Sequence, residues 1–254
     1  MTLTVDPAAQ ARSLALALAI PTFNEAENIT PLLERVQATL GPSGIDYQVI
    51  VVDDGSSDAT AERVREFGTR DPRVKLLVRK DERGLASAVV RGWQSSPAAV
   101  LGVMDADLQH PPELLPELWR AMQNGADLAL ASRYVPSATM KGWSLTRRLL
   151  SVVGIWTTGF VVPKHRRVSD PASGFFLVRR EAIAGLPLAA QGFKLLLEVL
   201  VRGRIQRVAE VPFQFGIRRA GKSKGSAGVV VDYFVLLWKL RRARRARAGE
   251  GALK

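Results

Sequence analysis

Residues 98–109 read Ala-Ala-Val-Leu-Gly-Val-Met-Asp-Ala-Asp-Leu-Gln, so an apolar run from Ala98 to Met104 ends directly in Asp105-Ala106-Asp107-Leu108-Gln109. A short and continuously apolar run is typical of a strand that is buried on both faces, as in a parallel sheet. Two earlier runs have the same form, Leu14–Ile20 and Gln48–Val52. They end in Pro21-Thr22-Phe23-Asn24-Glu25 and in Asp53-Asp54-Gly55-Ser56-Ser57-Asp58. The sequence therefore predicts three buried strands with polar ends.

Helical patterns separate these strands. Apolar residues recur at helical spacing over Ile29–Leu40, and Asp58 is a candidate N-cap for a helix that runs through Phe67. A short strand at Val74–Val78 precedes a helix at Leu85–Gln94, and Pro111 and Pro112 begin a helix that Gly125 ends. Weaker strands are expected at Leu128–Ala131 and Phe175–Val178. The alternation predicts an α/β fold, a Rossmann-like and mostly parallel sheet with flanking helices.

Composition limits the class of protein. The chain has 254 residues, of which 47% are hydrophobic, which is enough for one domain with a sizeable core. It has no cysteine, so disulfides, thiolate metal sites and cysteine nucleophiles are excluded, and a cytosolic setting is the simplest expectation. The formal net charge of +12 favours an anionic partner, which can be nucleic acid, a phosphorylated substrate or an acidic lipid surface.

The apolar stretches do not predict a signal peptide or a membrane span. Leu14–Ile20 runs straight into Pro21 without a cleavage pattern and fits a buried strand better. Leu149–Val162 and Val229–Leu240 both fall short of the roughly 18 to 20 residues that cross a bilayer.

The acidic strand ends predict a metal site. Ligands in open α/β sheets bind beyond the carboxyl ends of the strands, so the three polar ends are expected to meet. Unpaired carboxylates so close together would raise one another's pKa, and a divalent cation removes that conflict. The spacing of Asp105, Asp107 and Gln109 allows three oxygen ligands to face one ion. Hard oxygen ligands favour Mg²⁺ or Mn²⁺.

A solvated acidic turn is the main alternative to a metal site at these residues. An isolated Asp-x-Asp is more often such a turn, but the buried strand before it and the two other polar strand ends favour the metal site. The chain has neither a Gly-x-Gly-x-x-Gly motif after its first strand nor a Gly-Lys-Ser/Thr phosphate loop. His110 and His165 are the only histidines, and both are expected to be structural or on the surface.

The motifs resemble those of glycosyltransferase family 2, whose members have the GT-A fold. The resemblance covers about residues 14 to 225. It is carried first by Pro21-Thr22-Phe23-Asn24-Glu25, Val51-Val52-Asp53-Asp54-Gly55-Ser56 and Asp105-Ala106-Asp107. Within the family the chain is similar to the polyprenyl-phosphate (dolichyl-phosphate) mannosyltransferases. That narrower likeness rests on Ser132-Arg133-Tyr134, Gly142-Trp143 with Arg147-Arg148 and Ser151, Ser169-Asp170 with Gly174-Phe175, and Phe215-x-x-Arg218-x-x-Gly221-x-Ser223-Lys224.

The resemblance implies roles for the matching residues. Those expected to bind the nucleotide-sugar are Pro21, Phe23, Glu25, Val51, Asp53, Asp54, Asp105, Ala106, Asp107, Arg218 and Lys224. Asp105, Asp107, Arg133 and Arg218 are the expected catalytic residues, with Arg218 and Lys224 on a segment that closes over the pyrophosphate. The acceptor phosphate is expected at Ser132, Arg133 and either Arg147 or Arg148. Phe23 departs from the family, which often has tyrosine there, and this leaves the fine nucleotide specificity open.

The resemblance also implies an inverting transfer of a hexose to a polyprenyl or dolichyl phosphate, with mannose and GDP-mannose favoured. Residues 1–12 are expected to be a flexible tail, 13–225 the catalytic domain, and 226–254 an amphipathic and basic segment. The apolar stretches at 149–162 and 229–240 are expected to form interfacial helices, and the arginines of 241–247 would attract anionic headgroups. The protein is therefore expected to be peripheral, at the cytoplasmic face of the membrane.

Three rival functions fit parts of the sequence. A UDP-sugar transferase of the same fold, such as one that uses UDP-glucose, differs only in the donor. A nucleotidyltransferase usually has a glycine-rich and basic loop after its first strand, which Pro21–Glu25 does not supply. A non-enzymatic nucleic-acid binder would account for the charge but not for the placement of the carboxylates, so no nucleic-acid partner is expected.

Overall fold

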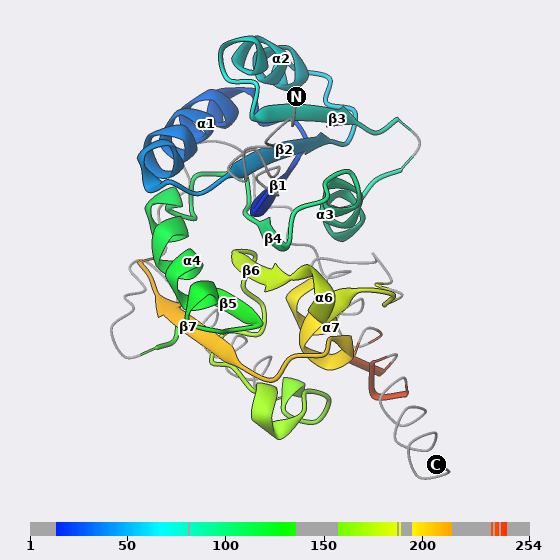
Figure 1. Cartoon of the computed structure of the whole chain (residues 1–254). Coiled ribbons are helices and arrows are strands. Elements are labelled where there is room, and N and C mark those ends of the chain that lie inside the picture. The colour runs from blue at the N-terminus through cyan, green and yellow to red at the C-terminus, as the bar shows by residue number, and fades with distance from the viewer. Residues whose placement is uncertain are drawn as a thin grey trace, which may run out of the picture.

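The computed structural model describes residues 14–80, 82–135, 157–186, 188, 195–214, 235, 237, 238 and 240–242. In this part of the chain one sheet has seven strands, in the order β3-β2-β1-β4-β6-β5-β7 (Figure 1). The strands are β1 (Leu16–Thr22), β2 (Tyr47–Asp53), β3 (Val74–Val78), β4 (Val100–Val103), β5 (Leu128–Ser132), β6 (Phe176–Arg179) and β7 (Val208–Pro212).

The sheet is mostly parallel, as the sequence predicts. β1 pairs in parallel with β2 and β4, β2 pairs in parallel with β3, and β5 pairs in parallel with β7. β6 is the exception, because it runs antiparallel to both of its neighbours, β4 and β5. The parallel strands that flank β6 still point the same way, so their carboxyl ends reach one edge of the sheet.

Helices cover both faces of the sheet. The α-helices are α1 (Ala26–Leu40), α2 (Thr60–Arg70), α3 (Leu85–Gln94), α4 (Leu115–Gln123), α6 (Arg180–Ile183) and α7 (Leu195–Arg202), and the 3₁₀ turns are η2 (Gly41–Ser43), η3 (Pro112–Leu114) and η4 (Lys164–Arg166). Helices α1, α2 and α4 share one hydrophobic core, whereas α3, α6 and α7 share the other (Figure 1). Leu16 to Ile20 of β1 are fully buried between these two cores, which explains why this run is apolar without alternation.

Helix α3 packs unusually close to the sheet. A Cβ atom on Gly92 would lie 3.0 Å from Cγ2 of Val52 and 3.1 Å from Cβ of Ala19. Glycine on the helix and alanine on the strand therefore allow this approach. The close packing fixes α3 against β1 and β2, the strands that carry two of the polar ends.

The strand register brings the polar ends to one level. Thr22 pairs with Asp53, and Asp53 pairs with Val78, so β1, β2 and β3 end side by side. Val103 pairs with Ala19, which places Asp105, two residues further along, level with Pro21. The expected convergence of the three polar strand ends is confirmed.

The expected strands are all present, and so are the expected helices of the first half. Helix α2 begins at Thr60 rather than directly after Asp58, although Oδ1 of Asp58 accepts a hydrogen bond from the Thr60 amide at 3.0 Å. Elements α6, α7 and β7 were not expected. Residues 1–12 and most of 226–254 lie outside the described residues, so the predicted division of the chain stays a prediction.

Candidate functional site

The loops that follow β1 and β2 are hydrogen-bonded to each other. The amide of Asn24 donates to Oγ of Ser56 at 2.8 Å, and Oδ1 of Asn24 accepts from the amide of Ser57 at 2.9 Å. Asn24 has a φ of 56°, a left-handed conformation that asparagine tolerates better than most residues. The two polar strand ends therefore form one connected unit.

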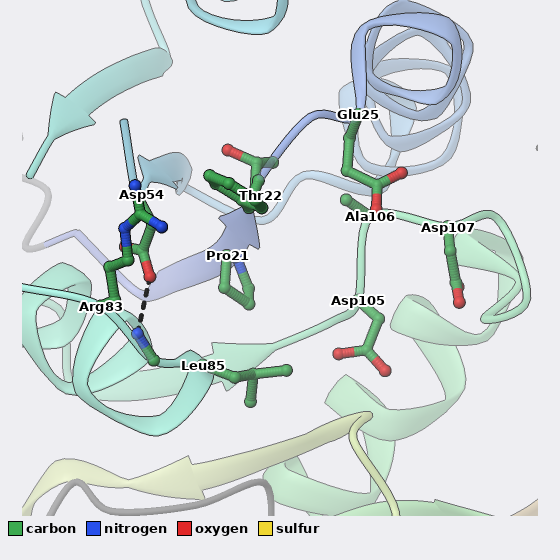
Figure 2. Close-up of a pocket in the computed structure, with 11 residues that line it drawn as sticks. Pro21, Thr22, Glu25, Asp54, Arg83, Leu85, Asp105, Ala106 and Asp107 are labelled. Carbon is green, nitrogen blue, oxygen red and sulfur yellow. Dashed lines mark hydrogen bonds between the residues drawn. The ribbon is translucent and has the colours of Figure 1, made fainter. Parts of the chain in front are cut away.

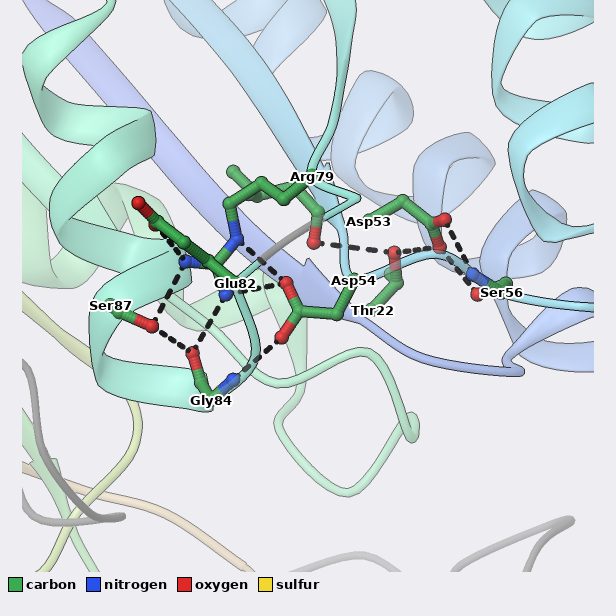
Figure 3. Close-up of polar contacts among 9 residues, drawn as sticks. Thr22, Asp53, Asp54, Ser56, Arg79, Glu82, Gly84 and Ser87 are labelled. Carbon is green, nitrogen blue, oxygen red and sulfur yellow. Dashed lines mark hydrogen bonds and ion pairs between the residues drawn. The ribbon is translucent and has the colours of Figure 1, made fainter.

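Two aspartates of the second polar strand end hold this unit together. Asp53 is 1% exposed, and its carboxylate accepts from Oγ1 of Thr22 at 3.1 Å and from the amide of Ser56 at 2.9 Å (Figure 3). Asp58 accepts from the amide of Ala26 at 3.1 Å. Desolvation raises the pKa of Asp58, but the hydrogen bonds from Thr60 and Ala26 outweigh it, and the pKa lies below its usual value. Both carboxylates thus have structural partners.

A pocket of about 380 Å³ opens where the strand ends meet (Figure 2). Its walls come from the end of β1, the residue after β2, the start of α3 and the loop after β4. The lining residues are Pro21, Thr22, Phe23, Glu25, Asp54, Arg83, Gly84, Leu85, Asp105, Ala106 and Asp107. Its volume lies within the usual range for small-molecule sites, and its position is where open α/β sheets bind ligands.

The pocket has ends of opposite charge. Asp105 and Asp107 lie at one end, and Figure 2 shows the guanidinium of Arg83 at the other, beside Asp54. The centre of the Arg83 guanidinium lies 5.1 Å from the centroid of the Phe23 ring. A ligand that combines an aromatic group with phosphates, as a nucleotide does, matches this division between the two ends.

The acidic loop after β4 has a constrained backbone. The amide of Gln109 donates to Oδ1 of Asp107 at 3.1 Å, and Leu108 between them has a φ of 63° while its side chain is 8% exposed. A left-handed leucine costs about 1–2 kcal/mol, and such strain is concentrated at functional sites. On the other side, a Cβ atom on Gly174 would lie 2.8 Å from Oδ2 of Asp105. Glycine therefore lets the segment before β6 pack against this carboxylate.

The oxygen ligands of this loop fit a hard divalent cation. Asp105 and Asp107 supply two carboxylates to the same pocket, and the side-chain amide of Gln109 follows on the same loop. Among the described residues, no group of three or more His, Cys, Asp or Glu side chains could hold a metal ion. A cation here would therefore depend on oxygens besides the two carboxylates, which is how Mg²⁺ is usually held beside substrate phosphates.

His110 supports the acidic loop from the core. It is 4% exposed, and its ring lies 5.5 Å from the Phe175 ring and 5.9 Å from the Phe213 ring, between centroids. Burial lowers the pKa of His110 to about 3, and the positive charge of Arg133 acts in the same direction. The ring is neutral at physiological pH, and its Nδ1 accepts from the amide of Asp105 at 3.3 Å. This placement agrees with the structural role expected for His110.

Arg133 follows β5 and forms a buried ion pair with Asp170. Its Nε donates to Oδ2 of Asp170 at 2.6 Å, its Nη2 donates to Oδ1 at 2.7 Å, and Asp170 is fully buried. Burial lowers the pKa of Arg133, but the hydrogen bonds and charge of Asp170, together with the charge of Asp105, raise it above its usual value. The guanidinium therefore stays charged beside the acidic loop.

The structure brings together many of the residues expected to bind the donor. Pro21, Phe23, Glu25, Asp54, Asp105, Ala106 and Asp107 all line the one pocket. Val51, Asp53 and Ser132 lie in strands or at their ends and are at most 1% exposed, so none of them is part of the pocket wall. Arg147, Arg148, Arg218 and Lys224 lie outside the described residues. The individual roles stay predictions.

Two arginines near the pocket were not expected. Arg79 lies directly after β3, and its guanidinium binds Asp54 at a distance of 25 residues along the chain, which no local pattern reveals. Arg83 lines the pocket itself. The sequence could have indicated Arg83, because the strand Val74–Val78 is also followed by charged residues and is a fourth polar strand end.

Comparison with known families gives one match over most of the chain. Residues 17–186 match the model of the family described as Glycosyl transferase family 2. Among curated relatives, the dolichol-phosphate mannosyltransferase of Pyrococcus furiosus is 42% identical over 227 residues, which are 89% of this chain and 64% of the relative. The polyprenol monophosphomannose synthase of Mycolicibacterium smegmatis is 33% identical over 254 residues, which are 95% of this chain and 94% of the relative.

Solved structures agree on the fold. Glucosyl-3-phosphoglycerate synthase from Mycobacterium tuberculosis, in complex with Mn²⁺, uridine diphosphate and phosphoglyceric acid, superposes with a TM-score of 0.65 at 19% identity. The superposition covers 86% of this chain and 74% of that chain. Together with the family match, it confirms the expected GT-A type of sheet and flanking helices.

Proposed function

Because the chain belongs to glycosyl transferase family 2, we propose that it transfers a hexose from a nucleotide-sugar to a polyprenyl or dolichyl phosphate. Mannose is the favoured sugar, since the relatives at 42% and 33% identity are named for mannosyl transfer to such lipids. GDP-mannose is the favoured donor on the resemblance of the sequence motifs alone. The observation that carries the proposal is the pocket itself. It combines the aromatic ring of Phe23 with the carboxylates of Asp105 and Asp107 at the carboxyl edge of the sheet.

The donor is proposed to lie along the pocket. Pro21, Phe23 and Glu25 bind the base and ribose at the end of β1, and the pyrophosphate lies toward the β4 loop. Asp105, Asp107 and Gln109 would hold Mg²⁺ or Mn²⁺, which would supply positive charge for the leaving diphosphate. The fold relative from Mycobacterium tuberculosis has structures with uridine diphosphate and either Mn²⁺ or Mg²⁺, which supports a divalent cation in general.

The reaction is a direct displacement. An oxygen of the acceptor phosphate attacks C1 of the sugar, the bond from C1 to the diphosphate oxygen breaks, and the nucleoside diphosphate leaves with both electrons of that bond. A phosphate monoester has its second pKa near ~6, so the acceptor is already largely dianionic at neutral pH and needs no general base. A buried His110 with a pKa of about 3 is suited to support, not to proton transfer. Attack from the face opposite the leaving group inverts the configuration at C1.

Arg133 is proposed to bind the acceptor phosphate. Its side chain is 14% exposed and the charge of Asp105 acts on it, so it lies beside the loop that holds the leaving group. The ion pair with Asp170 fixes the guanidinium through Nε and Nη2. Ser132 supports the same strand end, and Arg147 or Arg148 is proposed to complete the phosphate site, with Arg218 and Lys224 closing over the donor.

The test is sugar transfer by the full chain to polyprenyl phosphate, with GDP-mannose or UDP-glucose and with Mg²⁺ or Mn²⁺. GDP-mannose is expected to be used faster. Asp107→Ala is expected to lower transfer by on the order of 100-fold or more. Without this ligand the divalent cation would bind more weakly, and the charge on the leaving diphosphate would lose its counter-charge. Asp46→Ala removes an exposed carboxylate outside the pocket and is the matched control. Equal rates for Asp107→Ala and wild type would refute the assignment.

The protein is also proposed to act as a peripheral protein on the cytoplasmic face of the membrane. None of the described helices is long and apolar enough to cross a bilayer. Leu237 and Leu240 are buried in the core shared with α7, whereas Val235 and Trp238 are 45% and 61% exposed. The guanidinium of Arg242 lies 5.7 Å from the Trp238 ring. An exposed tryptophan beside arginines matches an interface of apolar lipid and anionic headgroups.

Vesicle co-sedimentation tests this membrane contact. Wild type is expected to bind vesicles that contain anionic lipid, and Trp238→Ala is expected to bind several-fold more weakly, since an indole supplies much of the apolar contact. Trp93 is buried, so Trp93→Ala would disturb the core and cannot serve as a control. The control is Arg65→Ala, which removes an exposed side chain on α2. Equal binding by wild type and Trp238→Ala would contradict the proposed contact.

A further inference from the structure

Arg83 lies in the pocket, in the segment between β3 and α3, and it has no part in the proposed binding of donor, metal or acceptor. Its guanidinium centre is 5.1 Å from the centroid of Phe23, the aromatic ring proposed to bind the base. It lies at the opposite end of the pocket from Asp105 and Asp107, as Figure 2 shows. A cation that served the pyrophosphate would be expected beside the acidic loop. This one lies where the base is expected.

The segment that carries Arg83 is tied down on both sides. Before it, Arg79 donates from Nε to Oδ1 of Asp54 at 2.8 Å (Figure 3). After it, the amide of Gly84 donates to Oδ2 of the same carboxylate at 2.8 Å. Arg79 also donates from Nη2 to the Gly84 carbonyl at 3.0 Å and from Nη1 to Oγ of Ser87 at 2.9 Å.

Asp54 therefore binds both Arg79, after β3, and Gly84, directly after Arg83. The pair is buried, with 4% of the Arg79 side chain and 10% of the Asp54 side chain exposed. Gly84 has a φ of 127°, a conformation that side chains rarely adopt. The backbone on the C-terminal side of Arg83 is consequently fixed, while the Arg83 side chain itself is exposed toward the pocket. This is how a binding side chain is held in position by its neighbours.

We propose that Arg83 is a base-recognition residue that selects guanine over uracil in the donor. The inference rests on the proposed function, because it assigns a role within the same nucleotide site. Contact with the Phe23 ring fixes the orientation of the Arg83 guanidinium. The two parallel N–H groups of the guanidinium then match two hydrogen-bond acceptors that lie side by side. Guanine presents O6 and N7 on one edge, and arginine pairs with both. Uracil has one acceptor, O4, at the corresponding edge and leaves half of the fork without a partner.

Calorimetric titration of the full chain with GDP, UDP and inorganic pyrophosphate, each with Mn²⁺, tests this role. Arg83→Ala is expected to weaken GDP binding about 10-fold, to change UDP binding much less, and to leave pyrophosphate binding unchanged. Arg83→Lys is expected to behave like Arg83→Ala, because an ammonium keeps the charge but lacks the planar fork. Arg91→Ala, at an exposed position on α3, is the matched control.

A modified nucleotide sharpens the test. 7-Deaza-GDP lacks the N7 acceptor, so it is expected to bind wild type several-fold more weakly than GDP and to bind Arg83→Ala as well as GDP does. Equal losses for GDP and UDP in Arg83→Ala, or weaker pyrophosphate binding, would overturn the assignment and make Arg83 a general or phosphate contact. GDP binding to wild type with no change in Arg83→Ala would overturn this inference alone. No binding of either nucleoside diphosphate to wild type would overturn the proposed function with it.

Discussion

Removing Arg79 should destabilise the fold far more than removing an arginine with the same pairing at the surface. Arg79 binds Asp54 through Nε at 2.8 Å and Nη2 at 2.5 Å, and the two side chains are 4% and 10% exposed. Arg79→Met keeps much of the side-chain volume but leaves Asp54 buried without its cation. Breaking a buried pair on one side costs about 3–5 kcal/mol, because the remaining charge stays out of water.

The chain offers a matched comparison. Arg35 also binds a carboxylate through two nitrogens, with Nε at 2.9 Å and Nη2 at 2.7 Å from Glu113, but these side chains are 40% and 55% exposed. Water compensates for the loss of such a pair, so Arg35→Met should cost at most about 1 kcal/mol. The two substitutions remove the same two-nitrogen pairing with a carboxylate, but they differ in burial and in the further hydrogen bonds that Arg79 donates to Gly84 and Ser87.

The assay is urea unfolding followed by far-ultraviolet circular dichroism, from which the free energy of unfolding is extrapolated to water. Arg79→Met, Asp54→Asn and the double variant form a cycle that isolates the coupling of the pair. We expect the double variant to be less destabilised than the sum of the single variants. If Arg79→Met costs no more than Arg35→Met, or if the single effects simply add, the buried pair does not stabilise the pocket.

Two further predictions concern the metal loop and acid stability. Gly174→Ala would place a Cβ atom 2.8 Å from Oδ2 of Asp105 and displace that carboxylate. We expect the variant to bind Mn²⁺ on the order of 10-fold more weakly, as measured by calorimetry. An unchanged affinity for Mn²⁺ would contradict this prediction. Hydrogen bonds from Arg73 hold the pKa of Asp71 in the folded protein below its usual value. The ionised Asp71 therefore stabilises the fold fully above pH ~4, and this contribution is lost as the pH falls through the lower folded-state pKa. Asp71→Asn should therefore flatten the decline in unfolding free energy below about pH 4, and a decline as steep as that of wild type would contradict the assignment.

The part of the fold around the pocket could be predicted because its signals are local. The runs before Asp53 and Asp105 are short, apolar and followed by polar residues, and strands buried on both faces need no alternation. Parallel strands bring their carboxyl ends to one edge, so the meeting of these residues follows from the strand directions alone. The location of the site was therefore available from the sequence before any packing was known.

Other features depend on contacts between distant residues. Phe176–Arg179 is a short apolar strand, and nothing within it indicates that it runs antiparallel between β4 and β5. Helix α7 is buried on all sides, including Glu198 at 2% exposure, so it lacks the polar face that makes a helix visible in a sequence. These elements are specified by tertiary packing, which local patterns do not record.

The adjacent aspartates 53 and 54 show how this limit affects the assignment of function. Neighbouring residues of an extended chain point to opposite sides, so Asp53 reaches Thr22 and Ser56 while Asp54 reaches Arg79 and Gly84 (Figure 3). One carboxylate joins the ends of β1 and β2, and the other joins β2 to the segment before α3. An acidic pair at a strand end can thus build the pocket without touching its ligand. Loss of activity on substituting either aspartate would not by itself show contact with the nucleotide, whereas a loss that depends on the base would.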